Sequence, residues 1–165
     1  MTKILIIYFS QTGNTEKMAH AVADGVSEEG LAYQVKKVQE SSVDDLLDVD
    51  GIVIGSPTYF GTMAAEMKLF LDHSVIHFKK LKGKVGGAFA SSALLGGGNE
   101  TTVLAILQAL LIHGMIVEGT TDGGHYGPVA LGPPDKRSTE ECKQLGRRVA
   151  RLVKKIGSAS AGSVL

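Results

Sequence analysis

Short apolar runs alternate with helical stretches along the whole chain, and this pattern leaves few folds open. Ile4–Phe9 is a continuous apolar run, which is typical of a strand buried on both faces. Thr15–Glu28 follows with apolar residues at helical spacing, and Gly30 can end that helix. Further strands are predicted at Tyr33–Val38, Gly51–Ser56, Lys84–Ser91 and Met115–Glu118, and further helices at Ala64–His73, Glu100–His113 and Ser138–Ile156. Five strands separated by helices predict a three-layer α/β domain with a parallel sheet.

The chain is predicted to form one domain with a short tail. Its 165 residues suit a single hydrophobic core, and no linker or internal repeat divides them. We predict a domain at residues 1–156 and a flexible tail at residues 157–165, which is small and polar except at its end. The apolar run Ile4–Phe9 is too short for a signal peptide or a membrane span, so we expect a cytoplasmic protein.

The charge balance bears on the kind of partner that the chain can have. Basic and acidic residues number 17 each, so the formal net charge is zero, whereas nucleic-acid-binding proteins usually carry a basic excess. The basic clusters Lys79–Lys84 and Arg147–Lys155 alternate with apolar residues, which indicates solvated surfaces. The single cysteine, Cys142, lies in a predicted surface helix with no Cys or His at metal-ligand spacing. We therefore expect no nucleic-acid partner and no metal site.

The loop after the first strand is the first candidate site, because ligands bind beyond the carboxyl ends of strands in such sheets. It consists of Ser10, Gln11, Thr12, Gly13, Asn14 and Thr15. A loop that leads into a helix offers unpaired backbone N–H groups to an anion, and hydroxyls at this density can surround a phosphate. Neither Gly-x-x-x-x-Gly-Lys nor Gly-x-Gly-x-x-Gly occurs here, which argues against a nucleoside triphosphate or a classically bound dinucleotide. An ordinary capped turn is the alternative.

Two further loops have the composition expected around a flat ligand. The loop after the third strand contains Pro57, Thr58, Tyr59, Phe60 and Gly61, and its adjacent aromatic residues can line an apolar ring. The loop after the fourth strand contains Ser91, Ser92, Ala93, Leu94, Leu95, Gly96 and Gly97, and its glycines allow the main chain to approach a planar group. The alternatives are aromatic rings packed beneath the next helix and a plain flexible loop.

A fourth loop, Asp122–Pro128, follows the fifth strand and can cover the ligand. Its His125 can equally be an exposed loop residue. His113 and Tyr126 are the best polar or titratable candidates near a bound ring, although His113 also suits a structural place at a helix C-terminus. No catalytic residue is assigned from the sequence.

Together these loops resemble those of the flavodoxin-like superfamily up to about residue 156, and Ser10–Thr15 resembles its phosphate loop. Within the superfamily the chain is most similar to the WrbA-type NAD(P)H:quinone oxidoreductases. The residues that carry this likeness are Pro57–Gly61 with Met63, Met67, Phe70–Asp72, Gly83 and Lys84, Phe89, Gly96–Gly98 with Glu100 and Thr101, and His113–Met115. The resemblance implies a flavodoxin-like sheet of strand order 2-1-3-4-5 and FMN contacts at Ser10–Thr15, Thr58–Phe60 and Ser92–Gly97.

The chain departs from the WrbA-type pattern at three points. Ile112 stands where that family has the first His of His-His-Gly-Met, the chain contains no Trp, and segments before the third strand and after the fifth are shorter. The resemblance implies an FMN enzyme that passes electrons from NAD(P)H to a quinone-like acceptor, and a possible dimer or tetramer.

The alternative is a flavodoxin-type electron carrier between redox proteins, with no substrate turnover of its own. Flavodoxins are typically acidic around the flavin, which steers them to basic partners, whereas this chain is neutral. A phosphoacceptor receiver shares the topology, but Phe9–Gln11 and Ser56-Pro57 stand where it needs acidic residues. We therefore expect a small-molecule acceptor or a redox protein as the partner, and no membrane association.

Overall fold

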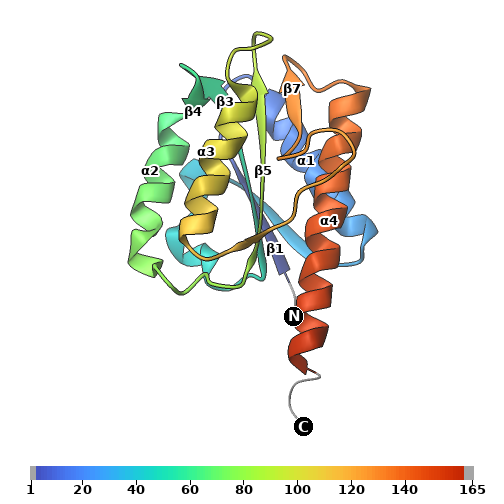
Figure 1. Cartoon of the computed structure of the whole chain (residues 1–165). Coiled ribbons are helices and arrows are strands. Elements are labelled where there is room, and N and C mark those ends of the chain that lie inside the picture. The colour runs from blue at the N-terminus through green and yellow to red at the C-terminus, as the bar shows by residue number, and fades with distance from the viewer. Residues whose placement is uncertain (1–2, 162–165) are drawn as a thin grey trace.

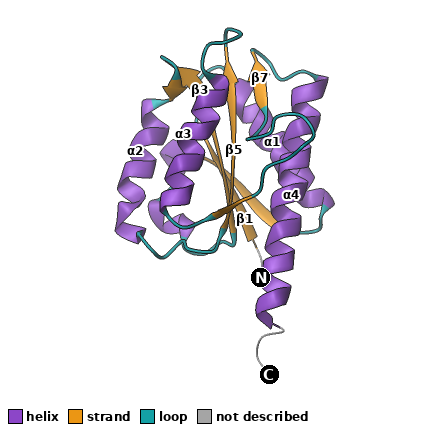
Figure 2. Cartoon of the chain, viewed as in Figure 1, coloured by secondary structure: helices purple, strands orange, loops and turns teal. Residues whose placement is uncertain are grey.

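The computed structural model describes residues 3–161 of the chain. Strands and helices alternate as predicted, with two additional short strands (Figure 1, Figure 2). The elements are β1 (Lys3–Tyr8), α1 (Asn14–Glu28), β2 (Ala32–Lys37), β3 (Gly51–Tyr59), β4 (Thr62–Met63), α2 (Ala65–His73), β5 (Val85–Ser92), α3 (Asn99–Ile112), β6 (Ile116–Val117), β7 (Val129–Leu131) and α4 (Lys136–Ala161).

The main strands form a parallel sheet in the order β2-β1-β3-β5-β6. β6 pairs with the start of β5, and β7 pairs in parallel with its end, so these two short strands together form the fifth strand. Residues 118–128 interrupt that strand. The predicted strand order 2-1-3-4-5 and the flavodoxin-like three-layer fold are confirmed. The strand predicted at Met115–Glu118 is present as β6, but its continuation as β7 was not predicted. The short β4 pairs antiparallel with the end of β3.

Helices cover both faces of the sheet, which explains the continuous apolar run of β1. Leu5 and Ile7 belong to a core shared with α2 and α3, whereas Ile4 and Ile6 belong to a core shared with α1 and α4. All four side chains are completely buried. Because successive side chains of a strand point to opposite faces, a strand between two helical layers must be apolar at every position.

The third strand was predicted to end at Ser56, before Pro57, but it continues through Pro57 to Tyr59. The carbonyl of Gly55 still accepts a hydrogen bond from the N–H of Phe9, but the pairing with β1 ends there. Pro57 lies two residues further along β3, so its backbone faces the same side as that of Gly55, towards β1. Because β1 no longer pairs with β3 at this point, no N–H donor is needed from residue 57. Proline is tolerated at such an edge position.

The last helix is longer than predicted at both ends. It begins at Lys136, after Asp135, whose side chain accepts a hydrogen bond from the N–H of Ser138 at 2.7 Å. It extends to Ala161, so residues 157–161 of the predicted tail are helical, and residues 162–165 lie outside the described residues. Cys142 lies in this helix as predicted, and its side chain is completely buried on the face that packs against the core.

Candidate functional site

The loop after β1 leads into a helix that has no side-chain cap. Gly13 is the N-cap residue of α1, with a left-handed φ of 88°, and its N–H donates a hydrogen bond to Ser10 Oγ at 3.1 Å. Gln11 and Thr12 are exposed beside it. Because the first N–H groups of a helix lack partners within the helix, they are available here to an anion, with the helix dipole in support.

One carboxylate lies in the first turn of α1, and neighbouring groups bind it. The Tyr8 hydroxyl donates to Glu16 Oε1 at 2.5 Å, and Lys37 Nζ lies 3.7 Å from the same oxygen. Burial and the Glu16 hydrogen bond raise the pKa of Tyr8, while the Tyr8 hydrogen bond holds the pKa of Glu16 below its usual value. Glu16 therefore stays ionised, with its charge partly offset by a donor and a cation.

Hydrogen bonds join the region of the Ser10–Thr15 loop to the two loops that were expected to hold a ring. The hydroxyls of Thr15 and Ser91, both buried, lie 2.9 Å apart and connect the first turn of α1 to the end of β5. The Tyr59 hydroxyl donates to Gln11 Oε1 at 3.0 Å and connects the loop after β3. The structure thus brings together residues that are up to 76 positions apart in sequence.

The loops after β3 and β5 also touch each other directly. Thr101 Oγ1 donates to the carbonyl of Gly61 at 3.2 Å, and the hydroxyls of Thr58 and Thr102 lie 3.0 Å apart. A Cβ added at Gly98 would lie 2.9 Å from the Gly61 Cα, so glycine is needed there for the close approach. Thr102 was not predicted as a site residue. Its place in the first turn of a helix that follows a glycine-rich loop could have indicated a hydroxyl contact with a neighbouring loop.

The turn between β3 and β4 exposes an aromatic ring in a strained conformation. Phe60 and Gly61 form a two-residue hairpin loop in which both φ angles are positive, at 48° and 82°. Such loops favour Asn, Asp and Gly, and the left-handed region is costly for a bulky side chain. Phe60 is nevertheless fully exposed, and Tyr59 is 39% exposed with its ring edge-on to Phe9 at 6.2 Å. Strain of this kind in a native structure indicates a function for the residue.

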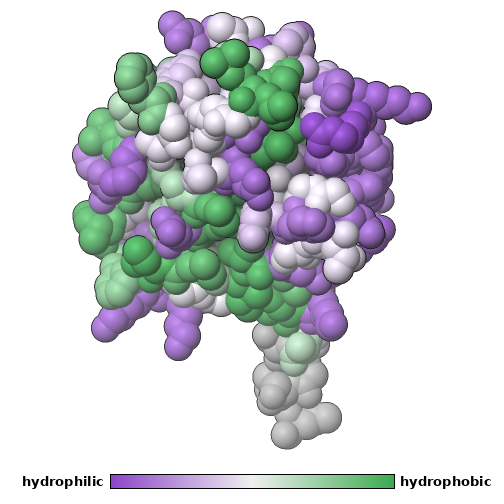
Figure 3. All heavy atoms as spheres, turned by 45° about the horizontal axis from the view of Figure 1, so that its top comes forward, coloured by the Kyte–Doolittle hydropathy of each residue, from purple (hydrophilic) through white to green (hydrophobic). Residues whose placement is uncertain are grey.

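Apolar side chains also protrude from the loop after β5. Leu94 and Leu95 are 72% and 88% exposed, and Gly96 has a φ of 71°. Ser92 Oγ donates to the carbonyl of Leu94 and accepts from Asn99 Nδ2, both at 3.1 Å, which fixes the base of this loop. Figure 3 turns the carboxyl ends of the strands towards the viewer and shows exposed apolar atoms on that face. Exposed apolar groups at the mouth of a sheet mark a binding surface.

Neither of the two candidate histidines, His113 and His125, lies among the loops after β1, β3 and β5. His113 caps the far end of α3, which at about 1.5 Å per residue lies about 20 Å from Gly98 at its start. It is buried, its Nε2 lies 2.8 Å from Ser74 Oγ, and burial lowers its pKa. His125 is exposed, with Nδ1 2.9 Å from the carbonyl of Thr120, and Tyr126 is half-exposed beside it.

The described part of the chain has neither a cluster of metal ligands nor a membrane-spanning helix. Within residues 3–161, no three His, Cys, Asp or Glu side chains come together in a way that could hold a metal ion. Nor is any helix in this part of the chain long and apolar enough to cross a lipid bilayer.

The site suits a ligand with an anionic tail and a flat, largely apolar ring. The uncapped N-terminus of α1 suits the tail, and the aromatic hairpin and the glycine loop suit the ring. No charged residue occurs in Ser10–Thr15, Pro57–Gly61 or Ser91–Gly97, so hydrogen bonds and the helix dipole would have to hold the anion. FMN has this combination of phosphate and ring, and the residues fit it.

Comparisons with known proteins agree with this geometry. The flavodoxin family model matches residues 6–110. A flavodoxin from Aquifex aeolicus is 41% identical over 93% of this chain and 88% of its own length. An NAD(P)H dehydrogenase (quinone) from Archaeoglobus fulgidus is 36% identical over 94% of this chain and all of its own length. Among solved structures, a WrbA-like flavodoxin from Agrobacterium tumefaciens has a TM-score of 0.81 at 27% identity and covers 94% of this chain and 99% of its own. The chain belongs to the flavodoxin family.

Proposed function

We propose that this chain is an FMN-dependent oxidoreductase that takes electrons from NAD(P)H and passes them to a quinone-like acceptor. The observation that carries the proposal is the convergence of three loops at the carboxyl edge of the sheet. These are an uncapped helix N-terminus, a strained aromatic hairpin and a glycine-rich loop, and hydrogen bonds join all three. Several relatives named NAD(P)H dehydrogenase (quinone) support the enzymatic assignment.

Each loop has a separate role in this proposal. The N–H groups at the start of α1, with the hydroxyls of Ser10 and Thr12, hold the phosphate of FMN. Tyr59, Phe60 and the main chain at Gly96 and Gly97 would hold the ring. When bound, FMN supplies the capacity to accept a hydride and release electrons, and the chain supplies binding, orientation and partial exclusion of water.

The second candidate function is an electron carrier without turnover, which the name of the A. aeolicus relative favours. The match to the A. fulgidus enzyme spans 190 aligned positions, more than the 165 residues of this chain, so that enzyme contains segments that this chain lacks. Against a carrier stands the formal net charge of zero, because carriers are usually steered to their partners by an excess of charge.

We also propose a homo-oligomer. Val75, Ile76 and Phe78 are 66%, 64% and 51% exposed beyond the end of α2, and Ile112 at the end of α3 is 72% exposed. Apolar surface of this extent is typical of faces that pair with another molecule. The oligomer size, the cytoplasmic location and the choice between NADH and NADPH stay predictions.

Steady-state turnover distinguishes the two functions. The FMN-loaded protein is mixed with NADH or NADPH and a benzoquinone, and the rate is compared with that of the same concentration of free FMN. An enzyme is expected to exceed free FMN by at least about a hundredfold, because bound reactants are held in orientation. A protein that retains FMN but does not exceed the free flavin contradicts the enzyme and supports the carrier.

A further inference from the structure

The segment that interrupts the fifth strand, residues 118–128, is attached to α4 at both ends by arginine side chains. Arg148 Nε donates to the carbonyl of Glu118 at 3.1 Å, where the segment leaves β6. Arg137 Nη2 donates to the carbonyl of Val129 at 3.2 Å, where β7 begins. Hydrogen bonds from charged donors are the stronger kind, so these two contacts are suited to hold a segment that has little regular structure of its own.

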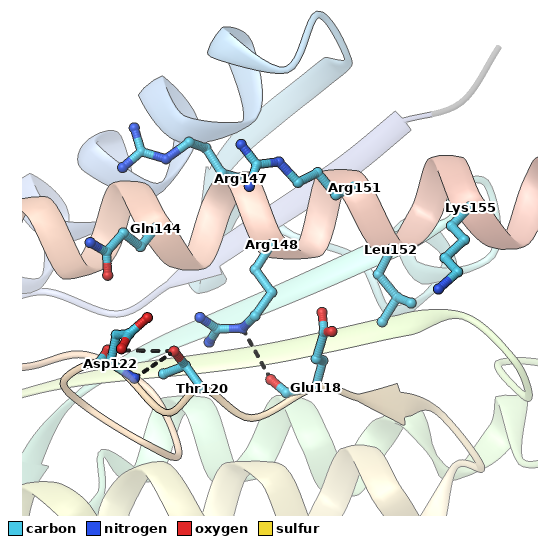
Figure 4. A pocket seen from close by; sticks show the side chains of 9 residues that line it. All are labelled: Glu118, Thr120, Asp122, Gln144, Arg147, Arg148, Arg151, Leu152 and Lys155. Atoms are coloured by element: carbon cyan, nitrogen blue, oxygen red, sulfur yellow. Dashed lines mark hydrogen bonds between the residues drawn. The ribbon is translucent and has the colours of Figure 1, made fainter.

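Beneath the start of this segment the packing is incomplete. A cavity of about 340 Å³ lies between it and α4, and Arg148 crosses from the helix to the segment (Figure 4). Glu118, Asp122, His125 and Tyr126 are exposed, so few apolar contacts fix this stretch. A segment with few buried contacts opens locally at low free-energy cost unless specific bonds retain it.

The other arginines of this part of α4 are used differently. Arg147 forms an ion pair with Glu28 at 2.5 Å and Arg151 with Glu29 at 2.7 Å, both on α1 and its C-cap. In Figure 4 these two side chains lie on the α1 side of the helix, whereas Arg148 points to the segment. Burial lowers the pKa of Arg148, which agrees with a guanidinium drawn out of water.

The charges around the cavity do not favour an anionic ligand. Glu118 and Asp122 line it together with Arg148 and Lys155, so acidic and basic groups balance once Arg147 and Arg151 are paired with α1. A structural role for Arg148 therefore explains the arrangement better than a second binding site does.

The segment connects directly to the predicted flavin site through β7. The N–H of Ala90 donates to the carbonyl of Pro128 at 3.1 Å, and the N–H of Gly132 donates to the carbonyl of Ser92 at 2.8 Å. Ser91, between them, pairs with Ala130 and bonds through its hydroxyl to Thr15 of the phosphate loop. Movement of the segment would loosen the strand that positions both the glycine-rich loop and Thr15.

We propose that Arg148 is a positioning residue that holds residues 118–128 against α4 and thereby keeps β7 paired with the end of β5 at the flavin site. The flavin part of this inference rests on the proposed function. The attachment of the segment does not.

The test compares Arg148→Gln with Arg151→Gln, which removes an arginine one turn away that contacts Glu29 and not the segment. Amide hydrogen exchange of residues 118–131 is measured without FMN, and the FMN dissociation rate and visible circular dichroism are measured with it. We expect Arg148→Gln to speed exchange and FMN release about five- to tenfold, the equivalent of one lost hydrogen bond. We expect Arg151→Gln to leave both unchanged, and Arg148→Lys, which retains one donor, to be intermediate.

Two results would overturn the inference. Unchanged exchange in Arg148→Gln would show that the segment does not depend on this side chain. Faster exchange with unaltered FMN release and circular dichroism would show that the segment is not coupled to the flavin site. A wild-type protein that fails to bind FMN would refute the proposed function, while the exchange measurement would still test the attachment.

Discussion

Phe60 holds a conformation that phenylalanine normally avoids, and it does so in full contact with water. A φ of 48° is unfavourable for phenylalanine, and the completely exposed ring gains no stabilisation from burial in the free protein. The neighbouring Gly61 completes a hairpin loop that Gly, Asn or Asp at position 60 would form with less strain. We therefore propose that Phe60, which is strained and gains nothing from burial, contacts the ring of a ligand.

Replacing Phe60 with Gly therefore separates stability from binding. We expect Phe60→Gly to raise the free energy of unfolding by about 1 kcal/mol, because glycine has no steric penalty at positive φ. FMN affinity should fall about five- to tenfold through the loss of ring contact. Urea unfolding of the free protein and fluorescence titration with FMN give the two quantities. A variant that loses stability and keeps its affinity would contradict this assignment.

Cys142 lies in the predicted surface helix, α4, but its side chain is buried. It belongs to the apolar stripe of that helix together with Leu145 and Val149. Burial raises the pKa of its thiol to about 12. The thiolate that reacts with disulfide reagents is therefore scarce at neutral pH.

We expect the native protein not to react with 5,5′-dithiobis(2-nitrobenzoate) at pH 7.5 within minutes. The same protein in guanidinium chloride should release one equivalent of thionitrobenzoate. Rapid labelling of the folded protein would show that Cys142 is accessible and would contradict its buried position.

Among the elements, the predicted bounds are correct where the hydrophobic periodicity of the sequence determines them. They are wrong where contacts with other parts of the chain determine them. The strands β1 and β5 and the helices α1, α2 and α3 lie within one residue or so of their predicted bounds. The end of β3 was predicted too early, at Ser56, because proline usually ends a central strand. The sequence does not show that β1 has already ended beside Pro57. The division of the fifth strand into β6 and β7 was missed because each piece is shorter than a periodic pattern can identify.

The C-terminal end of α3 contains a second element-scale feature, a buried neutral histidine. Ser74 Oγ donates to the carbonyl of Leu71, so His113 Nε2 must be the donor in its contact with that hydroxyl. Burial, with the charge of His77 as a lesser cause, lowers the pKa of His113. The unfolded chain therefore binds a proton more readily than the folded one, and stability must fall as the pH falls below the unfolded value of about 6.5.

We expect the free energy of unfolding to decrease between pH 7.5 and pH 5.5 in the wild type. His113→Gln should lower stability at pH 7.5 but flatten this dependence, because the titrating group is gone. Urea unfolding at both pH values measures the difference. An equally steep dependence in the variant would assign it to other groups.

At the scale of the whole molecule, the sequence predicted both the sheet and the three loops at its carboxyl edge. It could do so because buried parallel strands are apolar throughout and the loops that follow them differ sharply in composition. It could not predict how the loops meet, since the Thr15–Ser91 and Thr58–Thr102 contacts join distant parts of the chain. Nor could it show that α4 would retain residues 118–128 through Arg148.

Retention of the flavin by the purified protein tests whether the uncharged loop Ser10–Thr15, at the start of α1, holds the phosphate of FMN. The purified protein is incubated with FMN and desalted, and its visible absorbance is recorded for the wild type, Thr12→Ser and Thr12→Asp. Thr12 is exposed in the loop, so either substitution can be made without disturbing the core. We predict about one FMN per chain in the wild type and in Thr12→Ser. In Thr12→Asp the carboxylate should repel the phosphate dianion and weaken binding at least about tenfold. A wild-type protein that emerges colourless, or a Thr12→Asp variant that retains as much flavin as Thr12→Ser, would contradict the account.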